Sequence, residues 1–127
     1  MARIDKYDPI SGGFRAPLAA AYTGAAAPIA VGLNASGRVV TPTDSTCGIV
    51  GVLCCPYDKA AGDVVDIMTA GELTEFGGAA GTVYTANTTT GVISDAAASA
   101  TQTPVGFTVE ADRLIVRKAV APFDAVV

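Results

Sequence analysis

Along most of the chain, apolar residues occur in short runs that are separated by turn-forming residues. PIAVGL (28–33) predicts a first strand, NASG (34–37) a turn with glycine at a position of positive φ, and RVVTP (38–42) a return strand. The run GIVGVLCC (48–55) is almost continuously apolar, which is typical of a strand buried on both faces or at a subunit interface. These runs indicate a β-protein.

The pattern continues toward the C-terminus. VVDIM (64–68) alternates as a half-buried strand does, AGEL (70–73) predicts a tight glycine turn, and LTEF (73–76) predicts a short strand. RLIVRKAV (113–120) alternates well and is expected to close the sheet.

The second half of the chain repeats the first. Asn34 matches Asn87, Gly37 matches Gly91, Val39 and Val40 match Val92 and Ile93, and Gly51 matches Gly106, at separations of 53 to 55 residues. We therefore expect pseudo-repeats at about 29–76 and 82–120, joined by GGAAG (77–81) and packed as a compact β-barrel or sandwich. The alternative is a chance match within Gly-, Ala-, Thr- and Val-rich sequence. In the loop 95–100, Asp95 is an N-capping residue, so a single helical turn is expected there.

The N-terminal segment differs in character from the rest of the chain. We expect residues 1–28 to form an extended arm and residues 29–127 to form the β domain. The first fifteen residues combine large apolar side chains with arginine and lysine, while proline and glycine interrupt any regular element. A disordered tail is the alternative, but such tails are poor in large apolar residues. An arm that docks on a neighbouring chain accounts for this composition better.

Composition and charge exclude several partners. The 127 residues include 14 Gly and 7 Pro, half of the residues are hydrophobic, and no Trp is present, so the core is thin and built from small side chains. Such a core favours oligomerisation or docking on a larger surface. The net charge is −4 and the cations do not cluster, so we expect neither nucleic acid nor an anionic membrane surface as a partner. No apolar run is long enough to span a bilayer, and no signal-peptide pattern opens the sequence.

Residue types that carry catalysis are sparse. The chain has no His, and Ser45, Thr46 and Cys47 lack a base, so no catalytic residue is assigned. The three cysteines (47, 54 and 55) cannot supply the four ligands of a zinc site. We interpret them as small hydrophobes in a reducing compartment, with a redox role as the alternative. Four carboxylates at positions 63, 66, 72 and 75 are interpreted as solvated surface rather than a cation site, because strand spacing separates them. We expect no enzyme, no cofactor and no metal.

Several stretches together resemble a known family. The opening RIDKYDPISGGFRAPLAA (3–20), the hairpin AAGDVVDIM (60–68), and the closing GTVYTANTTTGVISD (81–95) and TPVGFTVEADRLIVR (103–117) resemble small head-decoration, or capsid cement, proteins of tailed bacteriophages, especially those that infect actinobacteria. The resemblance covers most of the chain, although turn glycines and Val/Thr alternation recur in many β proteins. It implies an all-β fold, a small β-barrel or β-tulip-like domain, that forms a homotrimer.

The resemblance also implies a function. Such proteins bind the outside of the capsid shell, bridge neighbouring capsomers and resist the pressure of the packaged DNA, so the expected partners are the major capsid protein and further copies of the chain. The expected location is the outer surface of the virion, which is assembled in the host cytoplasm. On this hypothesis the arm contacts the capsid, with Tyr7, Ile10 and Phe14 as apolar anchors and Arg3 and Arg15 as charged contacts. Alternatives are another virion β protein, such as a head–tail connector or tail-fibre base, and an enzyme of the β-clip type.

Overall fold

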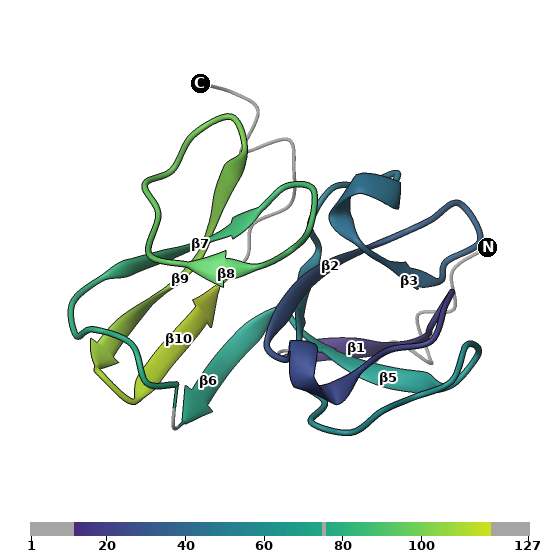
Figure 1. The fold of residues 1–127 in the computed structure, drawn as a ribbon, viewed down its shortest axis with the longest axis horizontal. Coiled ribbons are helices and arrows are strands. Elements are labelled where there is room, and N and C mark those ends of the chain that lie inside the picture. Colours follow the sequence, from purple (N-terminus) through teal and green to yellow (C-terminus); the bar gives the residue numbers. More distant parts are fainter. Residues whose placement is uncertain (1–11, 75, 118–127) are drawn as a thin grey trace, which may run out of the picture.

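The computed structural model describes residues 12–74 and 76–117, which form two five-stranded antiparallel sheets, each in its own lobe (Figure 1). The first lobe contains β1 (Gly13–Pro17), β2 (Ile29–Leu33), β3 (Val39–Val40), β4 (Gly51–Leu53) and β5 (Val64–Met68). The second lobe contains β6 (Ala70–Thr74), β7 (Val83–Asn87), β8 (Ile93–Ser94), β9 (Gln102–Glu110) and β10 (Arg113–Arg117). Two 3-10 turns, η2 (Gly24–Ala26) and η3 (Pro42–Asp44), are the only helical elements of the described residues. The all-β prediction is confirmed.

The second sheet repeats the strand order of the first. The orders are β1-β5-β4-β2-β3 and β6-β10-β9-β7-β8, so each strand of the first lobe has a counterpart five strands later. The pairing registers correspond as well, because Val31 lies opposite Gly51 in the first lobe and Tyr84 lies opposite Gly106 in the second. These are the positions that the sequence alignment of the two halves superimposes.

The first lobe curls around a core of its own. The sheet bends until Leu18, just beyond β1, forms a parallel bridge with Val39 of β3, and the amide of Ala19 donates to the carbonyl of Val39 at 3.0 Å. Seven buried side chains fill the interior: Ala16, Leu18, Val31, Val39, Leu53, Val65 and Ile67. The bridge joins the edges at one point only, and the described residues form no closed barrel. The predicted small all-β domain therefore consists of two five-stranded sheets and not of a closed barrel.

The two lobes share a second core. Ala30, Ile49 and Val52 of the first lobe pack with five buried residues of the second, which are Tyr84, Ala86, Val105, Leu114 and Val116. Strands β2 and β4 are therefore buried on both faces, because their alternate residues, Val31 and Leu53, fill the core of the first lobe. All three residues of β4 are buried, so the prediction of a strand buried on both faces is confirmed. The strand is shorter than predicted, because it covers only three residues of the apolar run.

Corresponding hairpin turns connect β2 to β3 and β7 to β8. The side-chain oxygen of Asn34 accepts hydrogen bonds from the amides of Ser36 and Arg38, and that of Asn87 does the same for Thr89 and Thr90. Each turn ends on a glycine of positive φ, Gly37 at 75° and Gly91 at 80°. The second turn contacts the other lobe. There the amide of Ala30 donates to the carbonyl of Gly91 at 2.9 Å, and Ile29 forms a bridge with Val92.

The boundary predicted for the N-terminal arm is wrong. Residues 13–17 form β1, which pairs along its length with β5, and residues 18–28 run over the first lobe. Tyr22 holds this stretch in place, because its backbone pairs with Lys59 and its hydroxyl donates to the carbonyl of Cys55 at 2.6 Å. The Ala-rich stretch has only a weak helix signal in sequence, and these tertiary contacts fix it instead. Residues 1–11 lie outside the described residues.

Two local predictions are also wrong. The predicted glycine turn AGEL lies within strand β6, because five residues from Ala70 pair with β10 and override the turn preference of Gly71. The loop 95–100 forms no helical turn. The loop is instead tied to β7, because the hydroxyl of the buried Thr85 donates a hydrogen bond to the carbonyl of Ala96 at 2.8 Å.

The lobe contact can be tested with a matched pair of glycines. A Cβ atom at Gly91 would collide with the carbonyl oxygen of Ala30, whereas one at Gly37 would have no neighbour within 4 Å. Both positions have positive φ, which costs alanine about 1–2 kcal/mol. We expect Gly37→Ala to lower the free energy of unfolding by about that amount and Gly91→Ala by roughly 2–4 kcal/mol, measured by urea denaturation. Equal losses would mean that the Gly91–Ala30 contact contributes little.

Candidate functional site

Of the five residues predicted to contact a capsid, the structure describes two. Arg3, Tyr7 and Ile10 lie outside the described residues. Phe14 is half-buried on β1 and packs against the core of the first lobe. Arg15 is exposed, and its Nε lies 3.0 Å from a carboxylate oxygen of Asp66 on the neighbouring strand β5. This pair is well solvated and contributes little to stability.

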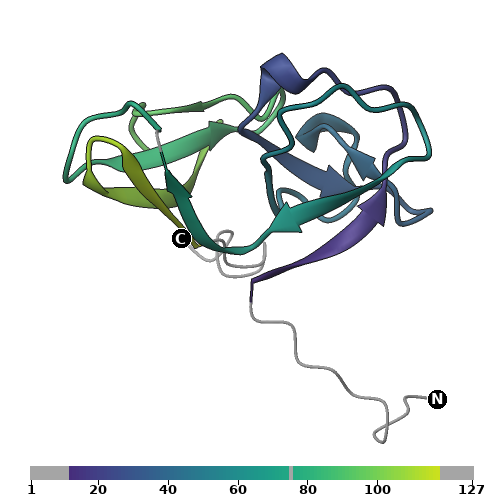
Figure 2. The ribbon, with the colours of Figure 1, turned by 90° about the horizontal axis from the view of Figure 1, so that it is seen from below.

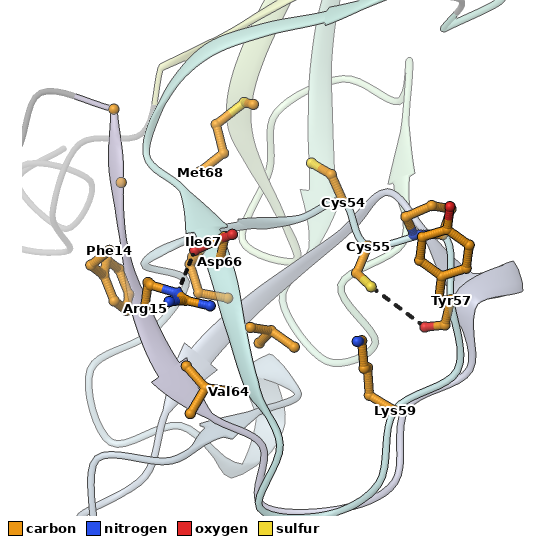
Figure 3. A pocket seen from close by; sticks show the side chains of 14 residues that line it. Phe14, Arg15, Cys54, Cys55, Tyr57, Lys59, Val64, Asp66, Ile67 and Met68 are labelled. Atoms are coloured by element: carbon orange, nitrogen blue, oxygen red, sulfur yellow. Dashed lines mark hydrogen bonds and ion pairs between the residues drawn. The ribbon is translucent and has the colours of Figure 1, made fainter.

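An open groove lies on the outer side of β1 and β5, with a volume of about 610 Å³. Figure 3 shows its walls, which β1 and β5 form on one side and the chain after β4 on the other. The side chains that line it are Phe14, Arg15, Cys54, Cys55, Pro56, Tyr57, Lys59, Val64, Val65, Asp66, Ile67 and Met68. Tyr57 is the most exposed large hydrophobic residue among them, at 71%. The groove offers apolar contact and two cations, but it has no base beside a nucleophile.

The cysteines are not arranged for catalysis. Cys47 is exposed, Cys54 and Cys55 are half-buried, and all three are free thiols. Burial raises the pKa of Cys54 from 9.0 to about 11, so its thiol stays protonated at neutral pH and is a poor nucleophile. Burial, and to a smaller extent the nearby thiols of Cys55 and Cys54, raises the pKa of Tyr22 to about 12.

The carboxylates bind within the fold instead of converging on one point. Asp63 accepts a hydrogen bond from the amide of Ala60 in the turn before β5, and Glu72 lies 3.4 Å from Arg113. Among the described residues, no group of three or more potential ligands could hold a metal ion. No helix in this part of the chain is long and apolar enough to cross a membrane.

The second sheet has an exposed apolar face that the sequence pattern did not reveal. Val83, Phe107 and Ile115 lie side by side on β7, β9 and β10, and Val109 follows Phe107 on the same face of β9. Phe107 is 42% exposed, Val109 47% and Val83 56%. We call these four residues the outer face. The alternation in GFTVE and RLIVR contained this signal, but alternation alone does not show which apolar residues face the core.

The outer face is exposed, whereas the corresponding residues of the first lobe are buried. By pairing register, its counterparts in the first lobe are Ala30, Val52 and Met68. Ala30 and Val52 are fully buried beneath the second lobe, and Met68 packs against the same cluster. The corresponding surface of the second lobe has no such cover among the described residues.

Charged groups flank the outer face. Arg113 lies between Glu72 and Glu110, with nitrogen–oxygen distances of 3.4 Å to each. Its Nε atom is buried and has no hydrogen-bond partner among the described residues. An apolar centre with a charged rim is typical of protein–protein contact surfaces.

Comparison with known proteins identifies the fold. Neither a protein-family profile nor a curated protein matches the sequence. Among solved structures, a chain of Mycobacterium phage Patience has the same fold, with a TM-score of 0.74 over 93% of this chain and 95% of that chain. The two sequences are 20% identical, so the likeness shows a shared fold that spans both lobes.

The raised pKa of Cys54 predicts a loss of stability at alkaline pH. The unfolded chain releases this proton near pH 9 and the folded chain near pH 11, so the stabilisation is complete below pH 9 and is lost as the pH rises from 9 through 11. Urea denaturation across this range is expected to show a smaller loss of stability for Cys54→Ala than for the wild type. Cys47→Ala, which removes an exposed thiol, is the control and is expected to follow the wild type. Parallel pH profiles for all three proteins would contradict the assignment.

Proposed function

We propose that this chain is a structural virion protein that binds the outside of a phage capsid shell. It joins neighbouring capsomers and so stabilises the head against the pressure of the packaged DNA. Its partners are the major capsid protein and further copies of itself, in a trimer, and it acts without catalysis, nucleic acid or a membrane. It is assembled onto the shell in the host cytoplasm and ends on the outer surface of the virion.

One observation carries this proposal: the fold shared with a phage chain over almost the full length of both proteins. The stretches that resemble capsid cement proteins support it independently, because they lie in both lobes and in the N-terminal segment. The distribution of charge also agrees with a partner other than nucleic acid. The described cations are Arg15, Arg38, Lys59, Arg113 and Arg117, which do not form a cluster of the kind that binds nucleic acid.

The outer face supports a role in contact with a shell. A patch of four apolar residues with a charged rim gives only a weak interface, since stable pairs of proteins bury about 800 Å² on each partner. On a capsid the contact is repeated many times, and a subunit held at several points binds far more tightly than each contact alone. Modest contacts of this kind therefore suffice for a cement protein.

The N-terminal segment contributes the remaining contacts in this proposal. Arg3, Tyr7 and Ile10 precede the described fold and stay in the proposed contact set. Arg15 is exposed and is retained with them. Phe14 is a weaker candidate than the sequence suggested, because it packs against the core of its own lobe.

The other virion roles predict a different position on the particle. A head–tail connector or a tail-fibre base lies at one vertex or on the tail, whereas a cement protein covers the shell. Electron microscopy of particles that carry a tagged copy distinguishes these cases. Label at the portal vertex or on the tail alone would overturn the proposal.

Capsid binding can be tested with a matched pair of surface variants. We expect the purified chain to sediment with undecorated capsids from the same phage genome. Phe107→Asp, which places a charge in the outer face, is expected to weaken binding at least about tenfold. Ser36→Asp is the control, because Ser36 is exposed in the turn between β2 and β3 of the first lobe, outside the outer face. Circular dichroism checks that both variants fold.

Sedimentation of the free chain measures self-association in the same experiment. A trimer that binds capsids agrees with the proposal, and a monomer that does not bind capsids contradicts it. Equal binding by Phe107→Asp and the wild type would show that the outer face is not the capsid contact.

A further inference from the structure

The groove beside β1 and β5 has apolar walls and an excess of positive charge. Its exposed hydrophobic residues include Tyr57 at 71% and Val64 at 51%. Two cations and one carboxylate line it, and the carboxylate, Asp66, is paired with Arg15. Lys59 makes no salt bridge with another described residue. In a chain with a net charge of −4, such a groove attracts an acidic partner with a small apolar surface.

The backbone of Lys59 holds this residue in the wall of the groove. It exchanges two hydrogen bonds with the backbone of Tyr22, at 2.8 Å and 2.9 Å. Figure 3 shows the lysine side chain on the wall that follows β4. The carboxylates nearest to it in the sequence, Asp58 and Asp63, each accept a hydrogen bond from a backbone amide at 2.9 Å. These two acids are therefore engaged within the fold, and the ammonium group of Lys59 can bind a carboxylate from another chain.

The turn between β9 and β10 has the opposite charge. Glu110 ends β9, Ala111 and Asp112 follow it, and all three residues are exposed. Glu110 shares the nearby Arg113 with Glu72, so three carboxylates stand near one cation. Because the residue between the two acids has only a methyl side chain, the turn is a narrow acidic projection.

The turn and the groove do not meet within one chain. Figure 2 shows the turn at the end of the second lobe that points away from the first lobe, which carries the groove. The amide of Phe76 donates to the carbonyl of Asp112 at 3.1 Å, which fixes the turn in place. A turn that is held in this way loses little conformational entropy when it binds.

We propose that the turn 110–112 of one copy docks in the groove of a second copy. Its carboxylates approach Lys59, and Ala111 packs beside Tyr57. The contact rests on the self-association in the proposed function and names the two surfaces that meet. Because these surfaces differ, the contact is heterologous, and it closes into a ring when the rotation between copies permits. A ring of three copies is the trimer of the proposed function.

A second copy is the occupant that the charges favour, because each chain carries one groove and one turn of opposite sign. The contact is small and its charges are solvated, so dissolved salt screens it and association is reversible. The outer face is not part of this contact and keeps the role proposed for it.

Sedimentation velocity of the free chain at low ionic strength tests the contact. The wild type is expected to form trimers. Lys59→Glu and Asp112→Lys are each expected to weaken association at least about tenfold, because each places like charges opposite each other. Asp95→Lys is the matched control, since it makes the same charge change in the exposed loop 95–100 and is expected to associate as the wild type does. Equal losses in Asp95→Lys and Asp112→Lys overturn the proposal, and so does a wild type that is monomeric at about 1 mM.

A double charge reversal shows whether the two groups meet. Lys59→Glu combined with Asp112→Lys has the net charge of the wild type and places opposite charges together again, so it is expected to recover self-association. Circular dichroism checks that each variant folds. A folded double variant that associates no better than the weaker single variant overturns the direct contact.

A disulfide identifies the chain that fills the groove. In a background in which alanine replaces the three native cysteines, Tyr57→Cys with Ala111→Cys is expected to form a disulfide between two chains. Tyr57→Cys with Val92→Cys is the control and is expected to oxidise more slowly, because Val92 is 57% exposed on a different hairpin. Oxidation within one chain, or equal oxidation of both pairs, overturns the proposal.

Failure of this contact can be told apart from failure of the proposed function, because all three experiments use the free chain. A monomer that binds capsids would overturn the contact alone. A chain that self-associates through the turn and the groove but does not bind capsids would contradict the capsid role alone.

Discussion

The second lobe depends on the first for its core. Tyr84, Ala86, Val105, Leu114 and Val116 would face solvent on one side if Ala30, Ile49 and Val52 did not cover them. Val105, Leu114 and Val116 are fully buried, and each side chain of this size contributes about 1.5–3 kcal/mol. Separating the lobes would therefore cost much of the stability of a small domain, which is about 5–15 kcal/mol in total. The two lobes are one folding unit, although each has a complete set of strands.

This contact explains the small residues at the lobe boundary. Ala30 has no side chain beyond Cβ, and Gly91 approaches its carbonyl so closely that a Cβ atom would not fit. Larger residues would push the lobes apart and open cavities in the shared core. The high content of Ala and Gly, which made the core look thin in the sequence, is in part a requirement for close approach between two sheets.

Local sequence predicted the two asparagine turns and strand β5 well, because those features depend on neighbouring residues. Asn34 and Asn87 specify their turns through hydrogen bonds to the next few amides, and VVDIM forms β5 without change. The errors arise where distant residues decide. Gly71 lies in a strand because β10 pairs with it, and Tyr22 is fixed because Lys59 and Cys55 lie beside it. The outer face could not be identified from sequence because β2 and β7 have the same alternation, and only packing decides which face is covered.

The two lobes are not equivalent in what they bury. One sheet face is covered at the lobe contact, and the corresponding face of the other sheet is exposed among the described residues. The first lobe buries Ala30 and Val52 against the second lobe, whereas their counterparts in the outer face, Val83 and Phe107, are exposed among the described residues. Two identical units related by a two-fold axis would bury the same patch on both units, so neither copy of that patch would remain exposed. This head-to-tail arrangement instead always ends with one bare surface. If the outer face is the contact that we propose, a duplicated module of this kind can bind through one end only, and it has one orientation on the surface that it binds.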